Sequence, residues 1–177
     1  MKERDIYNYD NAVFAPVRDP ARDVVAAYQT AARFADTVQE SLRIEHGMVF
    51  TADIIHELAH EMPKRFDQFG DMLHERHLMV EYPATPELVE RIEAPEKAFE
   101  IIIGVLDEIQ EALERFRKAT DSAILRPMSL FAEELMLKNS RDYTLILELW
   151  TMWDDSTSKT SFDSWAKKMG KRGRADD

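Results

Sequence analysis

The sequence predicts an all-helical protein whose core is a four-helix bundle. Only five glycines occur in 177 residues, and no stretch sustains the alternation of apolar and polar residues that marks a β-strand. Instead, apolar residues recur at steps of three and four in several segments, as on one face of a helix. We therefore expect one four-helix domain over residues 20–155, an N-terminal arm over 1–19 and a flexible basic C-terminal tail over 156–177.

The first two helices are expected over about 20–45 and 51–80. The first begins at Asp19-Pro20, which reads as an N-cap followed by proline at the first helical position, and it ends before Gly47. The second contains Pro63, which lacks an N–H, but the apolar stripe keeps its phase across the proline. One kinked helix is therefore predicted rather than two.

Three further elements complete the predicted chain. A short extra helix is expected over 86–93, after the proline-rich turn that follows the second long helix. The third long helix, over 95–120, has a regular apolar seam, and the fourth runs over 126–155 with a local break expected within 138–142. The seam of the third helix consists of Phe99, Ile102, Leu106, Ile109, Leu113 and Phe116.

Composition limits the functions that we consider. Cysteine is absent, which removes disulfides, thiolate metal sites and cysteine nucleophiles. No apolar run is long enough to span a bilayer and the first residues do not resemble a signal peptide, so a cytoplasmic protein is expected. The net charge is −11, but residues 165–177 carry five cations against two carboxylates, a sum of +3, which leaves −14 for the rest. Nucleic acid is therefore expected to bind only through that end, at Lys167, Lys168, Lys171, Arg172 and Arg174.

All five histidines lie between residues 46 and 77, among several acids. On a helical wheel, His56, His60, Asp71 and Glu75 share a face of the second helix that differs from its apolar stripe. Imidazole and carboxylate groups together suit zinc or iron. These side chains are candidate metal ligands outside the subunit's own core, and the alternative is a solvated helix face.

One ion cannot bind all four of these side chains within one chain. At about 1.5 Å per residue, His56 and Asp71 are about 22 Å apart along the helix. However, positions 56 and 75, like 60 and 71, lie at equal distances on either side of the point between residues 65 and 66. If two copies of the helix pack antiparallel about a two-fold axis there, His56 meets Glu75 of the partner subunit and His60 meets its Asp71. The sequence thus predicts two equivalent shared sites in each dimer.

This stretch resembles the Dps-type miniferritins of the ferritin superfamily. In that family a helix histidine is followed four residues later by an acid, and further on by Asp-x-x-x-Glu-Arg. The proline-rich turn and the expected helix over 86–93 resemble the small extra helix of those proteins, and the resemblance extends over about 20–155. The positions that match the motif are His56, His60, Asp71, Glu75 and Arg76.

Two departures from the family pattern concern the metal ligands. His60 stands where an acid is usual, which makes the site richer in nitrogen and zinc an alternative to iron. The family's His-Trp-x-x-x-Gly pattern in the first helix is absent. His46 is therefore the candidate for the ligand from that helix, with Glu45 or Glu40 behind it.

The resemblance implies a homo-oligomer, formed as a two-fold dimer that assembles further into a dodecamer. Such a shell takes up Fe(II), oxidises it with hydrogen peroxide or dioxygen at the inter-subunit sites, and stores ferric iron, which protects against oxidative damage. The iron ligands that it implies here are His46, His56, His60, Asp71 and Glu75. An acidic body fits this expectation because negative fields draw cations inward. DNA is a further candidate partner, through the basic tail.

Three other interpretations of the sequence compete with this one. His56-Glu57-Leu58-Ala59-His60 is the zinc-metallopeptidase signature, with the glutamate as general base and Glu81 as a conceivable third ligand, but no strand is expected to hold a peptide substrate. A ferritin-type metal centre inside the bundle needs a second Glu-x-x-His, and this interpretation fails because no histidine follows residue 77, although Glu100 and Glu133 leave a degenerate version open. A non-catalytic helical scaffold with surface histidines is the third interpretation.

Overall fold

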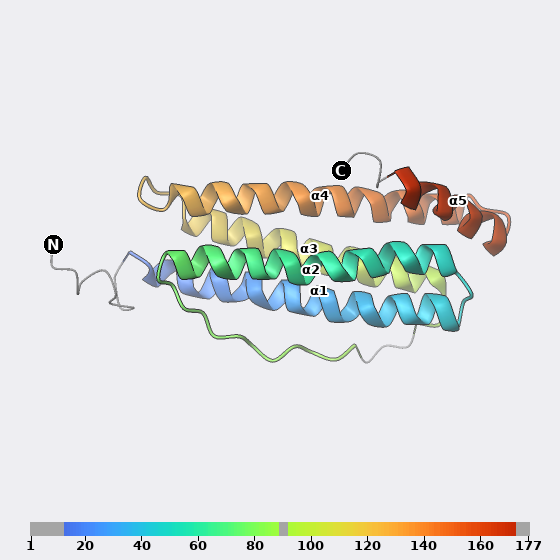
Figure 1. Ribbon diagram of the computed structural model, residues 1–177, viewed down its shortest axis with the longest axis horizontal. Coiled ribbons are helices and arrows are strands. Elements are labelled where there is room, and N and C mark those ends of the chain that lie inside the picture. The colour runs from blue at the N-terminus through green and yellow to red at the C-terminus, as the bar shows by residue number, and fades with distance from the viewer. Residues whose placement is uncertain (1–12, 89–91, 173–177) are drawn as a thin grey trace.

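The computed structural model describes residues 13–88 and 92–172, and Figure 1 shows that their regular structure is helical. The described ranges contain no β-strand, and four long helices form the bundle, as predicted. The predicted N-terminal arm falls mainly on residues outside the described ranges. The elements are η2 (Ala15–Val17), α1 (Arg18–Ile44), α2 (Val49–Glu75), α3 (Pro95–Ala119), α4 (Arg126–Asp154) and α5 (Lys159–Arg172).

The order of the helices in space follows from two short connections and one long one. Short turns join α1 to α2 and α3 to α4, so each of these pairs is antiparallel. The described residues 76–88 after α2 run back along the bundle beside α1, as Figure 1 shows, and α3 starts at the far end and therefore runs parallel to α2. An ion pair between Arg33 of α1 and Glu87, 3.1 Å, ties this crossing segment to the bundle.

The predicted core positions of α1 and α3 are confirmed. All six apolar residues of the α3 seam are buried, and Val24, Tyr28, Val38 and Leu42 are buried on α1. In α2 the helix continues through Pro63, whose side chain is exposed. The missing N–H of Pro63 therefore lies on the solvent side of α2, and the prediction of one helix through the proline is confirmed.

The end of α2 differs from the prediction. The helix ends at Glu75 rather than near residue 80, because His77 adopts a left-handed backbone conformation with φ +56°. The N–H of Leu78 donates to the carbonyl of Leu73 (3.0 Å) and that of His77 to the carbonyl of His74 (2.9 Å), which is the Schellman arrangement. Leu78 is buried, so an apolar contact closes the turn.

The predicted short helix over 86–93 is wrong for the residues that the structure describes. Residues 86–88 and 92–93 are not helical, and 89–91 lie outside the described ranges. Contacts at both ends hold the stretch instead: Tyr82, just before it, lies with its ring 5.5 Å from that of Phe66, and Ile92 within it is buried against the bundle. Two prolines, Pro83 and Pro86, fit such an extended path.

The expected break within 138–142 is also wrong, because α4 is continuous from Arg126 to Asp154. Asn139 is buried in that polar run, and its Nδ2 donates to the carbonyl of Leu106 (2.9 Å) and to Oε1 of Gln110 (3.1 Å) on α3. The polar residue thus faces α3 rather than solvent. Its hydrogen bonds satisfy the amide nitrogen without breaking the helix.

The flexible tail predicted over 156–177 is wrong for residues 159–172, which form α5. Phe162 and Ala166 are buried, and Phe162 packs edge-on against Trp153 with ring centroids 5.3 Å apart. Asp163 receives hydrogen bonds from the backbone N–H groups of Phe50 (3.3 Å) and Thr51 (2.9 Å). A carboxylate thus caps the first turn of α2 from a distant helix, which satisfies two N–H groups that have no partner within α2.

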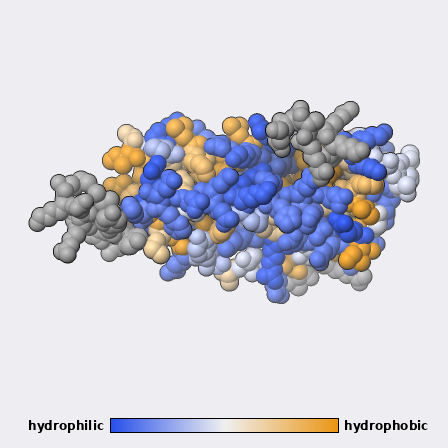
Figure 2. Space-filling view, in the orientation of Figure 1, coloured by the Kyte–Doolittle hydropathy of each residue, from blue (hydrophilic) through white to orange (hydrophobic). Residues whose placement is uncertain are grey.

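The surface fits a bundle that shows its polar stripes to water. The face drawn in Figure 2 is mainly hydrophilic, with scattered apolar side chains. Of the helices in the described ranges, none combines the length and apolar character needed to cross a membrane.

Candidate metal centre

The outward face of α2 carries four of the five predicted metal ligands. His60, Asp71 and Glu75 are exposed, and His56 is half-buried. Phe66 packs against the core on the other side of α2, where its ring contacts Tyr82 of the crossing segment. The face therefore points away from the bundle core, as the wheel predicts.

His56 and His60 converge on each other. Their Nε2 atoms lie 3.0 Å apart, and their rings meet edge to face with centroids at 4.3 Å. Two imidazole nitrogens bound to one metal at about 2.1 Å, at a right angle, would lie about 3.0 Å apart. The pair is thus spaced as two neighbouring ligands of one ion, and without an ion a single proton between the nitrogens gives a hydrogen bond.

Asp71 and Glu75 do not join this pair within the chain. They lie on the same face of the same helix, but about 16 Å and 22 Å further along it than His60, at about 1.5 Å per residue. Among the side chains of 13–88 and 92–169, no three His, Asp or Glu residues are grouped to hold a metal ion. Any ion bound at His56 and His60 needs ligands from elsewhere to complete its coordination.

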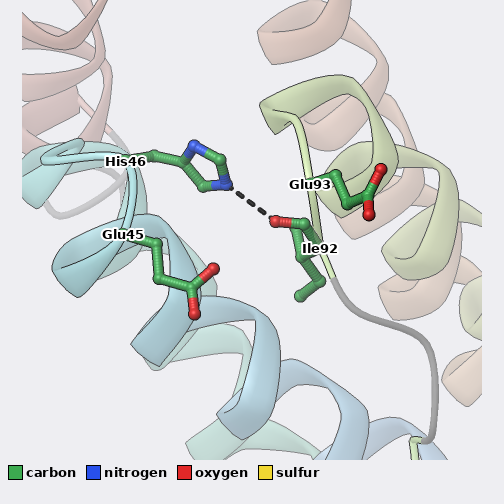
Figure 3. Close-up of a pocket in the computed structure, with 4 residues that line it drawn as sticks. All are labelled: Glu45, His46, Ile92 and Glu93. Atoms are coloured by element: carbon green, nitrogen blue, oxygen red, sulfur yellow. Dashed lines mark hydrogen bonds between the residues drawn. The ribbon is translucent and has the colours of Figure 1, made fainter.

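His46 lies apart from the other predicted ligands, in the turn between α1 and α2. Its Nε2 is 3.0 Å from the carbonyl oxygen of Ile92, so the ring ties this turn to the segment before α3. Glu45, Ile92 and Glu93 line the same open pocket of about 480 Å³. In Figure 3 the imidazole points at the Ile92 carbonyl, and the carboxylate of Glu93 points away from the imidazole. His46 therefore links the two segments at this pocket, and its ring does not converge with the carboxylates of Glu45 and Glu93 on a common point.

The interior of the bundle carries a guanidinium instead of a metal site. Arg65 of α2 is 8% exposed and forms an ion pair with Asp142 of α4. Burial raises the pKa of Asp142 above its usual range, and the hydrogen bond and charge of Arg65 oppose this rise. Burial likewise raises the pKa of Tyr28, whose hydroxyl is buried and has no hydrogen-bond partner.

The buried polar side chains exclude a metal centre in the core of the described bundle. Sites of that kind are built from inward-facing Glu and His on the four helices. The fully buried polar residues here include no carboxylate and no imidazole, and the carboxylate of Asp142, which is partly buried, is already paired with the guanidinium of Arg65. The buried polar residues are Thr30, Thr51, Arg65, Thr120, Ser129 and Asn139.

The predicted nucleic-acid residues belong to a helix. Lys167 and Lys168 are exposed on α5, and Nζ of Lys167 lies 4.5 Å from the centroid of the Phe50 ring. Lys171 and Arg172 are part of α5, but their side chains lie outside the described ones, and Arg174 lies outside the described residues. The lysines that can be placed therefore stand on a docked helix rather than on a loose tail.

Sequence reasoning missed three polar contacts that shape this region. Arg65 lies beside the apolar stripe of α2, so the sequence does not mark it as buried, and only the polar run that contains Asp142 indicates an interior polar contact. Asp163 bonds to residues more than a hundred positions away, for which a single sequence carries no local signal. Lys64 pairs with Glu61 on the outward side of α2. Lys64 and Asp67 lie at equal distances from the point between residues 65 and 66, as the predicted ligands do, and this spacing is visible in the sequence.

Comparison with known proteins decides the fold. No family model and no curated protein matches the chain. Among solved structures, it is similar to a crystal of a PmFTN variant soaked in iron for 3 h, with a TM-score of 0.76 at 16% identity over 84% of this chain and 97% of that one. A PmFTN variant soaked overnight gives a TM-score of 0.77 at the same identity, over 84% and 98%.

The fold is ferritin-like. The match covers almost the whole of those chains, and the order of four long helices with one long crossing segment agrees with the prediction. At 16% identity the likeness establishes the arrangement of the ferritin-like bundle. The chemistry depends on the side chains that the fold carries.

Proposed function

We propose that this protein is an iron-binding miniferritin of the Dps type, whose metal sites are shared between two subunits. The observation that carries the proposal is the pair of Nε2 atoms of His56 and His60, 3.0 Å apart on the outward face of α2. Half of a coordination shell is present in each chain. Pairing α2 with its copy about a two-fold axis between residues 65 and 66 brings the partner's Asp71 and Glu75 to these histidines.

Iron is the substrate of the proposed site. Two imidazoles and two carboxylates bind Fe(II) and leave coordination positions for an oxidant. Oxidation of two Fe(II) ions by one hydrogen peroxide transfers two electrons and yields two Fe(III) and two hydroxide ions. The strongly acidic body, −14 outside residues 165–177, attracts Fe(II) and offers carboxylates to the ferric product. Removing peroxide together with Fe(II) is the basis of the proposed protection against oxidative damage.

The bundle interior supports this location for the site. Arg65 and Asp142 occupy polar positions inside the bundle, and the outward face of α2 holds the convergent imidazoles. A further assembly of dimers into a closed shell, a dodecamer in the Dps type, would place many such sites around one store. Zinc remains an alternative occupant because His60 adds a nitrogen ligand.

Anaerobic Fe(II) titration followed by addition of peroxide tests the proposal. Wild-type protein is expected to bind Fe(II) at two equivalent sites per dimer, to oxidise it and to retain ferric mineral in a large assembly. His60→Ala is expected to weaken binding, because it leaves one imidazole where two converge. His46→Ala is the matched control and is expected to bind Fe(II) like the wild type, since His46 contacts Ile92 instead.

Other results would point to the competing functions. A small monomer that takes up no iron contradicts the proposal and leaves a helical scaffold. Zinc-dependent cleavage of a peptide, lost in Glu57→Gln, would instead favour the metallopeptidase interpretation.

DNA binding through α5 is a second proposal. It is favoured by the exposure of Lys167 and Lys168 on the outer side of a helix whose inner side is held by Phe162 and Ala166. Lys167→Glu combined with Lys168→Glu is expected to abolish a DNA mobility shift at low salt, because each lysine that neutralises a phosphate contributes to salt-dependent affinity. A mobility shift that is unchanged in this variant would refute DNA binding through α5. Deleting 165–177 is a poorer test, since it removes the buried Ala166.

A further inference from the structure

Two other side chains on the outward face of α2 share the symmetry of the predicted ligands. Glu57 and His74 are both exposed, and they too lie at equal distances from the point between residues 65 and 66. We propose that Glu57 and His74 of the partner subunit are additional metal ligands of the shared site, so that it takes divalent transition-metal ions at two adjacent positions. This inference rests on the proposed function, because it requires the same two-fold pairing of α2.

The heights of the residues along the paired helices bring these groups together. In the antiparallel pair, Glu75 of the partner subunit lies level with His56, and the partner's His74 lies level with Glu57. The two levels differ by about 1.5 Å, the rise of one residue. His60 and the partner's Asp71 lie one turn nearer the two-fold axis, about 6 Å away along the helix. All six groups therefore fall within little more than one helical turn.

The angular positions divide the six groups into two flanks. Residues 18 apart on an α-helix point in the same direction, since 18 residues make about five turns. His56 and His74 therefore share one flank of the α2 face, and Glu57 and Glu75 share the other. A two-fold axis perpendicular to the helices maps each flank onto the same flank of the partner. His56 thus shares a flank with the partner's His74, and Glu57 shares the other with the partner's Glu75, while Glu75 of the partner subunit remains level with His56 across the paired face.

The two flanks have different chemistry. One presents two imidazoles, which suit a nitrogen-preferring transition ion, and the other presents two carboxylates, which suit a harder ion. His60 and the partner's Asp71 stand between the flanks and can serve either position. The two carboxylates repel each other when no cation lies between them, and a divalent ion converts this repulsion into attraction.

The partner's His74 can take the place of the ligand that was expected from the first helix. The resemblance to the Dps type implies a ligand from the first helix, and the structure holds His46 on the carbonyl of Ile92, apart from His56 and His60. A third imidazole is nevertheless within reach of the shared site, because the two-fold axis supplies His74. In this account the ligand comes from α2 of the second subunit instead of α1.

Anaerobic calorimetric titration with Fe(II), and with Co(II) as a spectroscopic probe, tests the proposal on the intact protein. His74→Ala and Glu57→Gln are each expected to lose about half of the bound ions or to bind them roughly tenfold more weakly or worse. The Co(II) absorption of His74→Ala is expected to change with the loss of an imidazole ligand. His77→Asn is the matched control: it removes an exposed histidine three residues away, and asparagine tolerates the left-handed backbone there.

The outcome separates this inference from the proposed function. If His74→Ala and Glu57→Gln bind ions like the wild type while His60→Ala loses them, the additional ligands are refuted and the shared site stands. If His60→Ala also binds like the wild type, the shared site itself is refuted. Sedimentation of each variant confirms that the assembly is intact, so a lost ion reports a lost ligand.

Discussion

The two-fold pairing of α2 can be tested through a single pair of charges. Lys64 and Asp67 lie at equal distances from the point between residues 65 and 66, next to the proposed axis. Both are exposed, and within the chain Lys64 pairs only with Glu61 among the ion pairs of the described residues. In the paired helices each Lys64 lies level with Asp67 of the partner subunit, and both positions lie within about 30° of the centre of the paired face, so the long lysine side chain reaches that carboxylate. Symmetry makes this contact twice. Lys64→Asp turns both attractions into repulsions between carboxylates.

The size of the effect follows from the number and exposure of these contacts. An exposed ion pair contributes about 0.2–1 kcal/mol, and a like-charged pair costs a similar amount. Reversing the sign at two contacts should therefore weaken the dimer by roughly 1–4 kcal/mol, or about 5-fold to 1,000-fold in its dissociation constant. Lys64→Asp also places an aspartate beside Glu61, but this cost is paid in the monomer and the dimer alike.

Sedimentation equilibrium over a range of protein concentrations measures the change. Lys64→Asp and Asp67→Lys are each expected to weaken dimerisation, and the double variant is expected to restore it, because the reversed charges again face their opposites. The effect of each single variant should shrink as salt screens the exposed charges. Lys118→Asp on α3 is the matched control, since Lys118 is 67% exposed and pairs with Glu114, while Lys64 is 65% exposed and pairs with Glu61.

Either of two outcomes of the charge-swap experiment would refute the pairing. A Lys64→Asp variant that dimerises like the wild type shows that Asp67 of the partner does not face this position. A double variant as weak as the single ones shows that the charges act elsewhere. Registers one helical turn away make a distinct prediction: they set Lys64 opposite the partner's Pro63 or its Asp71, so Asp67→Lys could not rescue Lys64→Asp.

Two further predictions concern the frame that presents the α2 face. Arg65→Met should lower the free energy of unfolding by about 3–5 kcal/mol at pH 7.5, because it leaves the carboxylate of Asp142 buried without its cation. Loss of the Arg65 cation raises the pKa of Asp142 further, so the loss of stability should be small near pH 4 and grow as the pH rises. Urea denaturation at several pH values measures this, and Arg65→Met/Asp142→Leu, which removes both charges, is the comparison. Asp163→Ala should cost about 1 kcal/mol and speed hydrogen exchange in α5, because it removes the cap on Phe50 and Thr51; Ser164→Ala is the control.

The long helices were predictable because their signals are local. Each turn of α1 and α3 repeats the apolar spacing, so every turn independently indicates the same buried face of the helix. Pro63 did not mislead this reasoning, since the stripe keeps its phase across the proline and the missing N–H lies on the exposed side of α2. The outward position of His56 and His60 follows from the same wheel, and so does their spacing of one turn.

The parts that failed depend on contacts between distant segments. The inner side of α5 rests on Phe162 and Ala166 in a stretch rich in Ser, Thr and Lys, and its place is fixed by Asp163 at the start of α2. The segment over 86–88 has the composition of a short helix, but Glu87 reaches Arg33 of α1. His46 is the sequence candidate for the ligand from the first helix, but a carbonyl 46 residues away determines where its ring points.

The two faces of α2 together explain why the proposed site should require assembly. On its inner side the guanidinium of Arg65 is paired with the carboxylate of Asp142, so that carboxylate is already engaged inside the bundle. On its outer side His56 and His60 would supply half of the proposed coordination shell, and the carboxylates proposed to complete it lie too far along the same helix. An isolated chain can then bind Fe(II) only weakly, whereas a dimer has the full set of ligands. Oxidation would therefore be confined to assembled protein, so ferric product would form where a shell is available to hold it.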